Sequence, residues 1–406
     1  MELNIDKLTK ACEPGGSNSL RVLTELAPAG GEAAGIAPAR FLDGRTATYA
    51  YERRFVDGEA VHTVLIDGKA SSLNRIEEQI ATAIADGLMP LSLTPRITVT
   101  YPTLGTMSDL EAPHRCFDGH FRIGTIDGVP AVKHDAYIAL RNSKPSDALA
   151  LLQTSPASIA LGAWDSTRKS HQSRFRSPIT GEIIGILADQ DQPPSNPRRG
   201  GARTDHLSPS VRLSSTELKE IMEPQRDELG AKTIEKLEKE ATSAKNAPTS
   251  GSHLGVGSIP PALNTLGLVS CRRIIRQQVL SFAALRQLRF GKEMSLDGTV
   301  ACRALLAAWT LNGLARSNSE LVLRANCDLV EKGPEEYWLD ARHGKGETLT
   351  PLDITAADAL LTEAIDNARK KAGVRWEGQV LEIVGNPIID RTSEALDEDE
   401  DENKDK

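Results

Sequence analysis

The segment WDSTRKSHQSRF, at residues 164–175, concentrates side chains that could bind an anion. It follows a predicted strand and brings hydroxyl, amide and basic groups together in one loop. Phosphate and ribose contacts in nucleic-acid complexes come mainly from Arg, Lys, Ser, Gln and backbone amides. The composition therefore suits phosphate binding, although a plain surface loop remains the alternative.

A second unusual string is GSHLGVGSIPP at residues 251–261. Its glycines leave little side chain, so backbone N–H groups could approach an anion closely. The string has no P-loop lysine and does not match the dinucleotide fingerprint, which argues against nucleotide hydrolysis and NAD binding. A structural turn is the alternative.

Two further motifs have simpler explanations. In KASSLNR (69–75), Ser71 and Ser72 could cap a helix while Asn74 and Arg75 reach a ligand. In HRCFDGH (114–120), two histidines and a cysteine lie close together, but the sequence shows no fourth ligand for zinc. We expect neither a metal nor another cofactor. The Ser, His and Asp residues form no recognisable triad pattern.

Charge is distributed unevenly along the chain. The net charge is −8, but residues 394–406 contain eight acids and two lysines and so contribute −6. Such a segment is typical of a disordered tail. Residues 241–292 contain no acid and seven basic side chains, and residues 164–212 contain eight basic side chains against five acids. Both segments are candidate anion-binding surfaces.

Hydrophobic periodicity predicts the elements that position these motifs. A hairpin is expected over 46–55 and 60–67 around Asp57-Gly58, followed by a helix from Ser72 to Gly87 and a strand over 93–101. Further strands are predicted over 121–127, 132–141, 157–164, 320–331 and 379–384. Helices are predicted over 145–154, 214–243, 270–290, 297–315 and 356–372, and an exposed loop over 186–212.

This succession predicts an α+β protein built on an antiparallel sheet. We divide the chain into residues 1–185, a mobile loop and charged helical insertion at 186–247, a C-terminal part at 248–390 and an acidic tail at 391–406. Only 16 aromatic residues are present, which argues against an aromatic-lined binding protein. The five cysteines contain no CxxC pair, and no segment looks like a signal peptide or membrane span. We expect a cytoplasmic protein with no membrane partner.

Several strings together resemble the backbone subunit of the type I-G (formerly I-U) CRISPR Cascade complex, a member of the RAMP superfamily. The resemblance spans roughly residues 20–385 and excludes the acidic tail and much of 186–247. The strings that carry it are RVLTELAP, KASSLNRIE, GAWDSTRKSHQSRF, TDHLSP, GSHLGVGSIPP and RRIIRQQVLSFAALRQLRFG.

The resemblance implies a modified RRM-like, or ferredoxin-like, palm elaborated by fingers and thumb. It also implies a non-catalytic subunit that polymerises along CRISPR RNA and leaves the bases free to pair with target DNA. Other Cascade subunits and a recruited helicase-nuclease would complete the complex. On these grounds we expect RNA contacts from Asn74, Arg75, Arg168, Lys169, Arg174, Arg176, Ser252, His253, Gly255 and Gly257, and from a basic helix face carrying Arg272, Arg273 and Arg276.

Two alternatives stay open. One is a guide-directed RNA-cleaving backbone subunit that uses a loop aspartate, with Asp165 or Asp205 in that role, although Asp165 is more simply explained by an ion pair with Arg168. The other is a small-molecule enzyme that binds a free nucleotide through the Gly-rich string. The small-molecule enzyme would not require the chain to polymerise on an RNA.

Overall fold

The computed structural model describes residues 1–169, 172–208, 210–244 and 247–392. Helices and largely antiparallel sheets combine in it, which confirms the predicted α+β class. The chain divides into two compact units. Unit 1 comprises Met1–Ala39, Tyr51–Gln190 and the described residues from Ser270 onward, and unit 2 comprises Arg40–Ala50 and Asp191–Val269. The predicted acidic tail lies outside the described residues from position 393 on.

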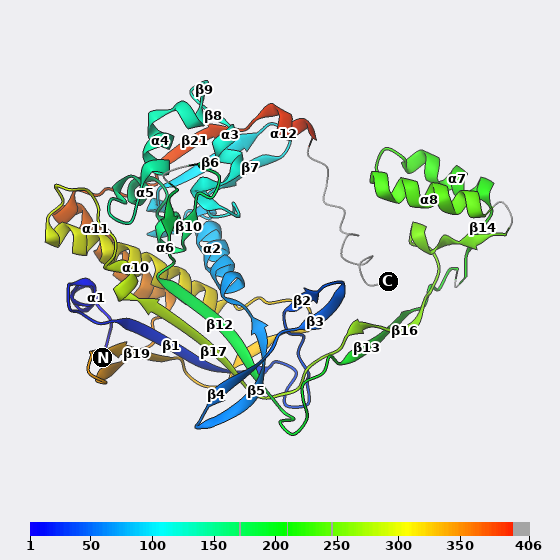
Figure 1. Ribbon diagram of the computed structural model, residues 1–406, viewed down its shortest axis with the longest axis horizontal. Helices are drawn as coiled ribbons and strands as arrows, with labels where there is room; N and C mark the ends of the chain where they lie inside the picture. The colour runs from blue at the N-terminus through cyan, green and yellow to red at the C-terminus, as the bar shows by residue number, and fades with distance from the viewer. Residues whose placement is uncertain (170–171, 209, 245–246, 393–406) are drawn as a thin grey trace. The chain divides into compact units, whose positions relative to one another are not determined.

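Unit 1 is built on an eight-stranded antiparallel sheet (Figure 1). The strands run in the order β20-β19-β1-β17-β12-β5-β4, and β18 pairs with β1 off this path. Their bounds are β1 (Ser19–Pro28), β4 (Tyr51–Val56), β5 (Glu59–Asp67), β12 (Ile179–Leu187), β17 (Cys271–Ser281), β18 (Leu329–Glu331), β19 (Glu336–Asp340) and β20 (Gly346–Leu349).

The β4–β5 hairpin confirms the prediction around Asp57-Gly58. Both turn residues have positive φ, 51° and 87°, as a two-residue hairpin turn of this kind requires. The predicted first arm began too early, because Thr46–Tyr49 forms a separate strand of unit 2.

Helices cover one face of this sheet. They are α1 (Ile5–Cys12), α2 (Lys69–Ala85), α9 (Phe282–Leu285), α10 (Leu296–Ser319) and α11 (Ile354–Ala372). The predicted helices at α2, α10 and α11 are confirmed. Helix α10 is buried along almost its whole length, so its apolar residues point in every direction rather than along one stripe.

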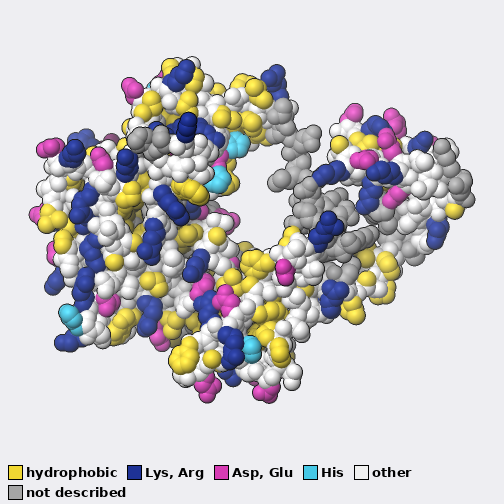
Figure 2. Space-filling view, viewed as in Figure 1, with side chains coloured by type: hydrophobic (Ala, Val, Ile, Leu, Met, Phe, Trp, Pro, Cys, Tyr) yellow, Lys and Arg dark blue, Asp and Glu magenta, His cyan; other side chains and the backbone are white. Residues whose placement is uncertain are grey.

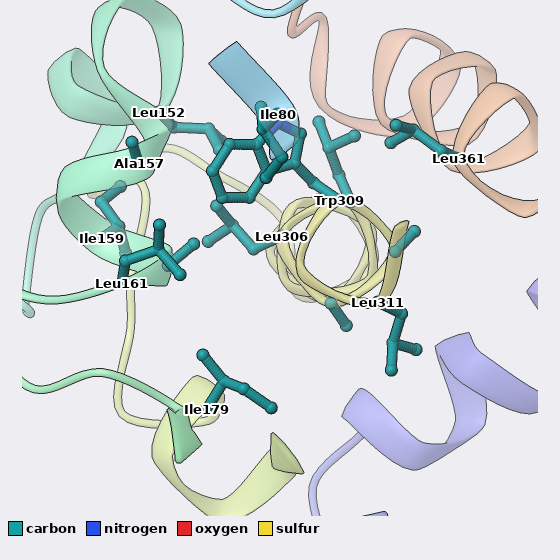
Figure 3. Close-up of a cluster of buried hydrophobic side chains, with 14 of the residues drawn as sticks. Ile80, Leu152, Ala157, Ile159, Leu161, Ile179, Leu306, Trp309, Leu311 and Leu361 are labelled. Atoms are coloured by element: carbon teal, nitrogen blue, oxygen red, sulfur yellow. The ribbon is translucent and has the colours of Figure 1, made fainter. Parts of the chain in front are cut away.

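Trp309 of α10 lies at the centre of the core. Figure 3 shows its ring beside Leu306 and near Ile80 of α2 and Leu152 of a neighbouring short helix. Its indole nitrogen donates to Thr94 Oγ1 at 3.1 Å, so the buried polar group is satisfied. This packing fixes α2 and α10 against each other.

The remainder of unit 1 forms a second, five-stranded sheet in the order β7-β6-β21-β8-β9, with β21 parallel to β6. Its strands are β6 (Arg96–Tyr101), β7 (Gly105–Ser108), β8 (Thr125–Ile126), β9 (Val129–Pro130) and β21 (Val380–Val384). Around it lie η1 (Leu91–Leu93), η2 (Arg115–Phe117), α3 (Gly119–Ile123), η3 (Ala131–Lys133), α4 (Asp135–Asn142), α5 (Leu149–Thr154), α6 (Pro156–Ala160), α12 (Pro387–Thr392) and the short pair β10 (Ala163–Trp164) and β11 (Arg174–Phe175).

Several predicted strands are wrong in this part of the chain. Residues 132–141 and most of 121–127 and 157–164 are helical or turn, and only the end of 320–331 is a strand. Apolar runs of this length fit a short buried helix as well as a strand, and burial by neighbours decides between them.

The predicted helix over 270–290 is also wrong, because residues Cys271–Ser281 form the central strand β17. Burial in β17 alternates between Ile274, Arg276, Gln278 and Leu280 on the helix-covered face and less buried residues on the other. Two of the inward positions are polar, so the apolar residues of this segment do not alternate with period 2 as those of a strand usually do. Their spacing matches the apolar stripe of a helix better, which explains the wrong prediction.

Unit 2 contains a two-stranded ribbon, β13 (Arg198–Arg203) with β16 (Ile259–Leu266), and a small helical part (Figure 1). The predicted loop over 186–212 therefore contains the end of β12 and all of β13. The other elements are β2 (Arg40–Asp43), β3 (Thr46–Tyr49), β14 (Arg212–Leu213), α7 (Ser215–Met222), η4 (Glu223–Gln225), α8 (Ala231–Ser243), β15 (Thr249–Ser250) and η5 (Gly251–Leu254).

The predicted helical insertion at 214–243 is confirmed as α7 and α8. Helix α7 begins with the predicted capping box, in which Ser214 and Glu217 bond each other's backbone N–H groups. Leu218, Met222 and Leu237 bury a small apolar core between the two helices.

No helix in the described residues has both the length and the apolar character needed to cross a membrane. The five cysteines are free, and four of them are buried.

Candidate nucleic-acid interface

The basic loop predicted over 164–175 is held at its neck by two short strands. Trp164 of β10 lies opposite Arg174 of β11, and Ala163 lies opposite Phe175. The Asp165 N–H continues the pairing by donating to the Ser173 carbonyl at 2.9 Å. The loop is therefore anchored at both ends, although residues 170 and 171 lie outside the described residues.

Asp165 is a structural residue of this loop. Its side chain is 1% exposed and accepts hydrogen bonds from Arg141 at 2.8 Å and from Thr167 Oγ1 at 2.9 Å. The predicted ion pair with Arg168 is therefore wrong, because Arg141 of α4 takes that place. The buried carboxylate is already paired with a guanidinium and hydrogen-bonded, which ties the loop to α4.

Arg168 anchors the loop to the end of α4. Its Nη1 donates to the Arg141 carbonyl at 2.7 Å and to Asn142 Oδ1 at 3.0 Å. It thus bonds acceptors of the protein itself and anchors the loop, while its expected phosphate contact stays a prediction.

Lys169 and Arg176 are exposed and have no ion pair among the described residues. Arg174 is exposed too, and its guanidinium lies over the ring of Trp164, 5.1 Å from the ring centroid. The loop thus presents three cations to solvent while its buried aspartate is already paired. These three side chains remain available for an anionic ligand.

Trp164 is a residue that the sequence interpretation missed. It is 51% exposed, although most large aromatics in the chain are buried. A sequence with only 16 aromatic residues gives no general reason to expect an exposed ring at this position. An aromatic residue immediately before a basic loop is the signal that could have found it.

Arg75 is occupied by an internal ion pair. Its guanidinium bonds both carboxylate oxygens of Asp67, one of them at 3.0 Å, and Ser71 Oγ at 3.1 Å. Asp67 is fully buried. We therefore remove Arg75 from the proposed interface.

Asn74 is exposed on α2 and lines a cleft of about 1020 Å³ between that helix and the β6–β7 hairpin. The cleft is lined by both signs of charge, with Arg96 and Arg115 against Glu77, Glu78 and Glu111. Acidic side chains beside the phosphate chain would oppose its binding.

The three arginines expected on a basic helix face lie instead on strand β17, so no such helix face exists. Arg272 is exposed, while Arg273 pairs with Glu25 and Asp57 at 3.2 and 2.9 Å. Arg276 is 2% exposed and bonds two glutamates inside unit 1. Because successive side chains of a strand point to opposite faces, the three cannot form one patch.

In unit 2, the Gly-rich string is fastened by Asp205. Gly255 and Gly257 have φ of 76° and 99°, values that glycine adopts without strain. The Gly257 N–H donates to Asp205 Oδ2 at 2.9 Å, so this amide is used within the unit. Ser252 and His253 belong to η5, but their side chains lie outside what the structure describes.

The other oxygen of Asp205 accepts the N–H groups of Leu207 and Ser208 at 2.8 and 2.9 Å. Hydrogen bonds from the N–H groups of Ser208, Leu207 and Gly257 hold the pKa of this carboxyl below its usual range. Asp205 therefore joins two loops by accepting three backbone hydrogen bonds within unit 2.

The β13–β16 ribbon carries arginines that the sequence analysis counted but did not assign. All six residues of β13 are exposed, including Arg198, Arg199 and Arg203. On β16, Ile259 and Leu263 are 61% and 67% exposed. The ribbon thus offers cations and apolar side chains together.

Among the described residues, no group of three or more His, Cys, Asp or Glu could hold a metal ion. His120 of the 114–120 motif shares a hydrogen bond of 2.7 Å with Tyr101 Oη. Cys116 is fully buried.

Figure 2 shows Lys and Arg side chains dispersed over the visible face, with acidic side chains between them. No single basic patch on this face identifies a binding surface. The interface must therefore be assigned from individual contacts.

One family model matches the chain, that of the CRISPR-associated protein GSU0053, over residues 20–190. No curated protein matches. The matched range includes β1, α2, β12 and the basic loop, and ends before the β13–β16 ribbon and β17. The match supports a CRISPR-associated protein with a role in CRISPR-Cas defence.

Proposed function

We propose that the chain is a non-catalytic backbone subunit of a type I-G Cascade complex that grips the phosphates of CRISPR RNA. The observation that carries this proposal is the anchored loop of unit 1, on which Lys169, Arg174 and Arg176 are exposed while Asp165 is buried and paired. This loop lies within the range matched by the CRISPR-associated family. Cations held on a rigid neck are suited to a regular phosphate chain.

The strand order supports an RRM-like, RAMP-type palm. Four strands run β19-β1-β17-β12, α2 lies in the chain between β1 and β12, and α10 lies between β17 and β19. This is the order of a split βαβ pair, the arrangement of ferredoxin-like folds. The other strands and unit 2 would be additions to that palm.

The face of this sheet that the helices do not cover supports binding of the RNA backbone rather than recognition of its bases. An ordinary RRM stacks bases on exposed aromatics of its central strands. Here neither central strand, β1 or β17, contains an aromatic residue, and the face carries a buried cluster formed by Val61, Ile184, Ile186 and Ile275. A guide holder needs to leave base edges free for pairing with target DNA.

The RNA-cleaving alternative receives less support. Both aspartates considered for that role have structural contacts, Asp165 in a buried ion pair with Arg141 and Asp205 in hydrogen bonds from three backbone N–H groups. A carboxylate that activates water or binds a metal needs free acceptor positions. The small-molecule alternative is weakened too, because the Gly257 N–H that could bind an anion already donates to Asp205.

Assembly with further copies and with other Cascade subunits follows from the proposal, as does recruitment of a helicase-nuclease. Head-to-tail polymerisation requires a heterologous surface that does not close on itself. The exposed arginines and apolar residues of the β13–β16 ribbon are our candidate for one side of it. The surrounding compartment would be the cytoplasm.

A salt titration tests the RNA grip. The double variant Lys169→Ala/Arg176→Ala should weaken binding of single-stranded RNA evenly across sequences. It should also lower the slope of log affinity against log salt by about 1.4, because each phosphate contact contributes about 0.7 for a single strand. Lys370→Ala on α11 is the control, since this lysine is exposed on another element. A loss confined to one RNA sequence would contradict the role.

A further inference from the structure

We propose that Trp164 is a stacking platform for one RNA base at the edge of the phosphate grip. This inference rests on the proposed function and adds a base contact that the phosphate-binding residues do not provide. The ligand class is an unpaired nucleobase whose neighbouring phosphate is held by Arg174.

Trp164 differs from the other tryptophans in its exposure. Trp309 and Trp376 are fully buried, and their indole nitrogens donate to Thr94 Oγ1 and to the Leu152 carbonyl. Trp338 is partly buried in β19. Trp164 alone among the four is a large exposed hydrophobic residue, at 51%. An exposed indole forgoes a sizeable burial free energy, which a stacked ligand would recover.

Arg174 increases the suitability of this ring for a nucleic acid. It lies opposite Trp164 in the β10–β11 pair, with its guanidinium 5.1 Å from the ring centroid. The guanidinium has no carboxylate partner among the described residues, so it remains a donor for phosphate. Beside this guanidinium, Trp164 is still 51% exposed to solvent.

The backbone on either side of Trp164 is firmly held. The Gly162 carbonyl accepts a hydrogen bond from Arg115 Nη1 at 2.7 Å, and the Asp165 N–H bonds the Ser173 carbonyl at 2.9 Å. Gly162 has φ of 85°, and a Cβ there would lie 2.9 Å from the Ser177 backbone nitrogen. The chain therefore crosses here too closely for any other residue. A preformed platform lowers the ordering cost of binding.

Single-base stacking does not conflict with a guide that stays free for pairing. A platform of one tryptophan per subunit can take one base and leave the rest of the strand to the phosphate contacts. Stacking is tolerant of sequence because every base has a π face. The same ring could instead dock an apolar segment of a partner protein, and the experiment separates the two.

The test compares a short single-stranded RNA with an abasic strand of the same number of phosphates. Binding is followed by anisotropy of a label on the strand and by tryptophan emission. Trp309 and Trp376 are buried and Trp338 is partly buried, so the part of the emission change that Trp164→Leu removes is assigned to Trp164. We expect quenching with the RNA and none with the abasic strand.

Variants then isolate the ring. Trp164→Leu should weaken binding of base-bearing RNA about tenfold and remove the quenching, while leaving affinity for the abasic strand unchanged. Trp164→Phe should retain most of the affinity and serves as the variant that preserves an aromatic ring. Unchanged emission from the buried tryptophans reports that each variant is folded.

The affinities of Trp164→Leu for the two strands distinguish base stacking from a purely structural role of the ring. If Trp164→Leu binds both strands as the unmodified protein does, the stacking inference is overturned while the proposed phosphate grip stands. If Trp164→Leu loses affinity for both strands equally, the ring supports the loop and does not stack a base. If the unmodified protein binds neither strand, the proposed function fails together with this inference.

Discussion

Arg276 of strand β17 donates a hydrogen bond of 2.7 Å to Glu335, and the same guanidinium nitrogen lies 2.7 Å from Glu331. The arginine side chain is 3% exposed and that of Glu335 is 12% exposed. Burial raises the pKa of Glu335, and the nearby positive charge of Arg276 acts in the opposite direction. An arginine expected at an RNA surface is thus part of the interior of unit 1.

Replacing Arg276 should therefore destabilise the fold. Arg276→Leu leaves Glu335 buried without its partner, and breaking a buried pair in this way costs about 3–5 kcal/mol of unfolding free energy. Arg272→Leu, at an exposed position of the same strand, should change it by less than about 0.5 kcal/mol. Urea denaturation of the two variants measures the difference. Equal midpoints would contradict the assignment.

Asp109 predicts a pH dependence of stability. Its carboxyl is fully buried and accepts hydrogen bonds from Ser155 and from the Ile97 N–H. Burial raises its pKa from 3.8 to about 7. Between these two values the folded protein keeps the proton and the unfolded chain releases it, so stability falls as pH rises across that window.

Asp109→Asn removes this ionisation while keeping a polar side chain of the same shape. The loss of melting temperature between pH 4 and pH 7 should be smaller in the variant than in the unmodified protein. Other titrating groups contribute equally to both proteins, so the comparison isolates Asp109. If the melting temperatures of the two proteins change with pH by the same amount between pH 4 and pH 7, the Asp109 carboxyl is ionised in the folded state and the prediction is wrong.

The two loop aspartates should behave as structural residues. Asp165→Asn weakens the bonds to Arg141 and leaves that cation, which is 14% exposed, without its partner. We expect a loss of about 3 kcal/mol in unfolding free energy. Asp205→Asn should loosen the Gly257 contact. We expect no RNA cleavage by the unmodified protein or by either variant. If the unmodified protein cuts RNA at regular intervals with magnesium, and either variant loses this activity, the RNA-cleaving alternative is supported instead.

Gly162 should be intolerant of a side chain. Gly162→Ala forces a Cβ against backbone atoms at a positive φ, and we expect a loss of about 1–3 kcal/mol in unfolding free energy. Gly128→Ala is the matched control, because Gly128 has φ of 77° and open space around its Cβ position. Equal losses in the two variants would mean that the close approach of Gly162 to the Ser177 backbone imposes no steric constraint.

Local signals in the sequence predicted the elements that depend on local physics. The Asp57-Gly58 turn, the capping box at Ser214 and the apolar period of α2 all appear where expected. Strand β17 could not be found this way, because Gln278 and Arg276 occupy inward positions whose partners, Asn318 and Glu335, lie far along the chain. Such long-range satisfaction of a buried polar group leaves no local trace in the sequence.

The candidate site shows the same limit. Composition located the basic loop correctly, since basic and hydroxyl residues gather there in the sequence. It could not separate Arg168, which bonds the end of α4, from Arg176, which is exposed. It also could not show that the Asp67 carboxylate occupies Arg75. Which cations remain available depends on tertiary contacts.

The central proposal is tested most directly by isolating the protein from cells that also make the other Cascade subunits and a matching CRISPR RNA. Native mass measurement and sequencing of the bound RNA then give the composition of the particle. We predict several copies of the chain on one guide RNA, which stays protected from nuclease. A nucleic-acid-free monomer under these conditions, above all one that binds a free nucleotide, would contradict the backbone role.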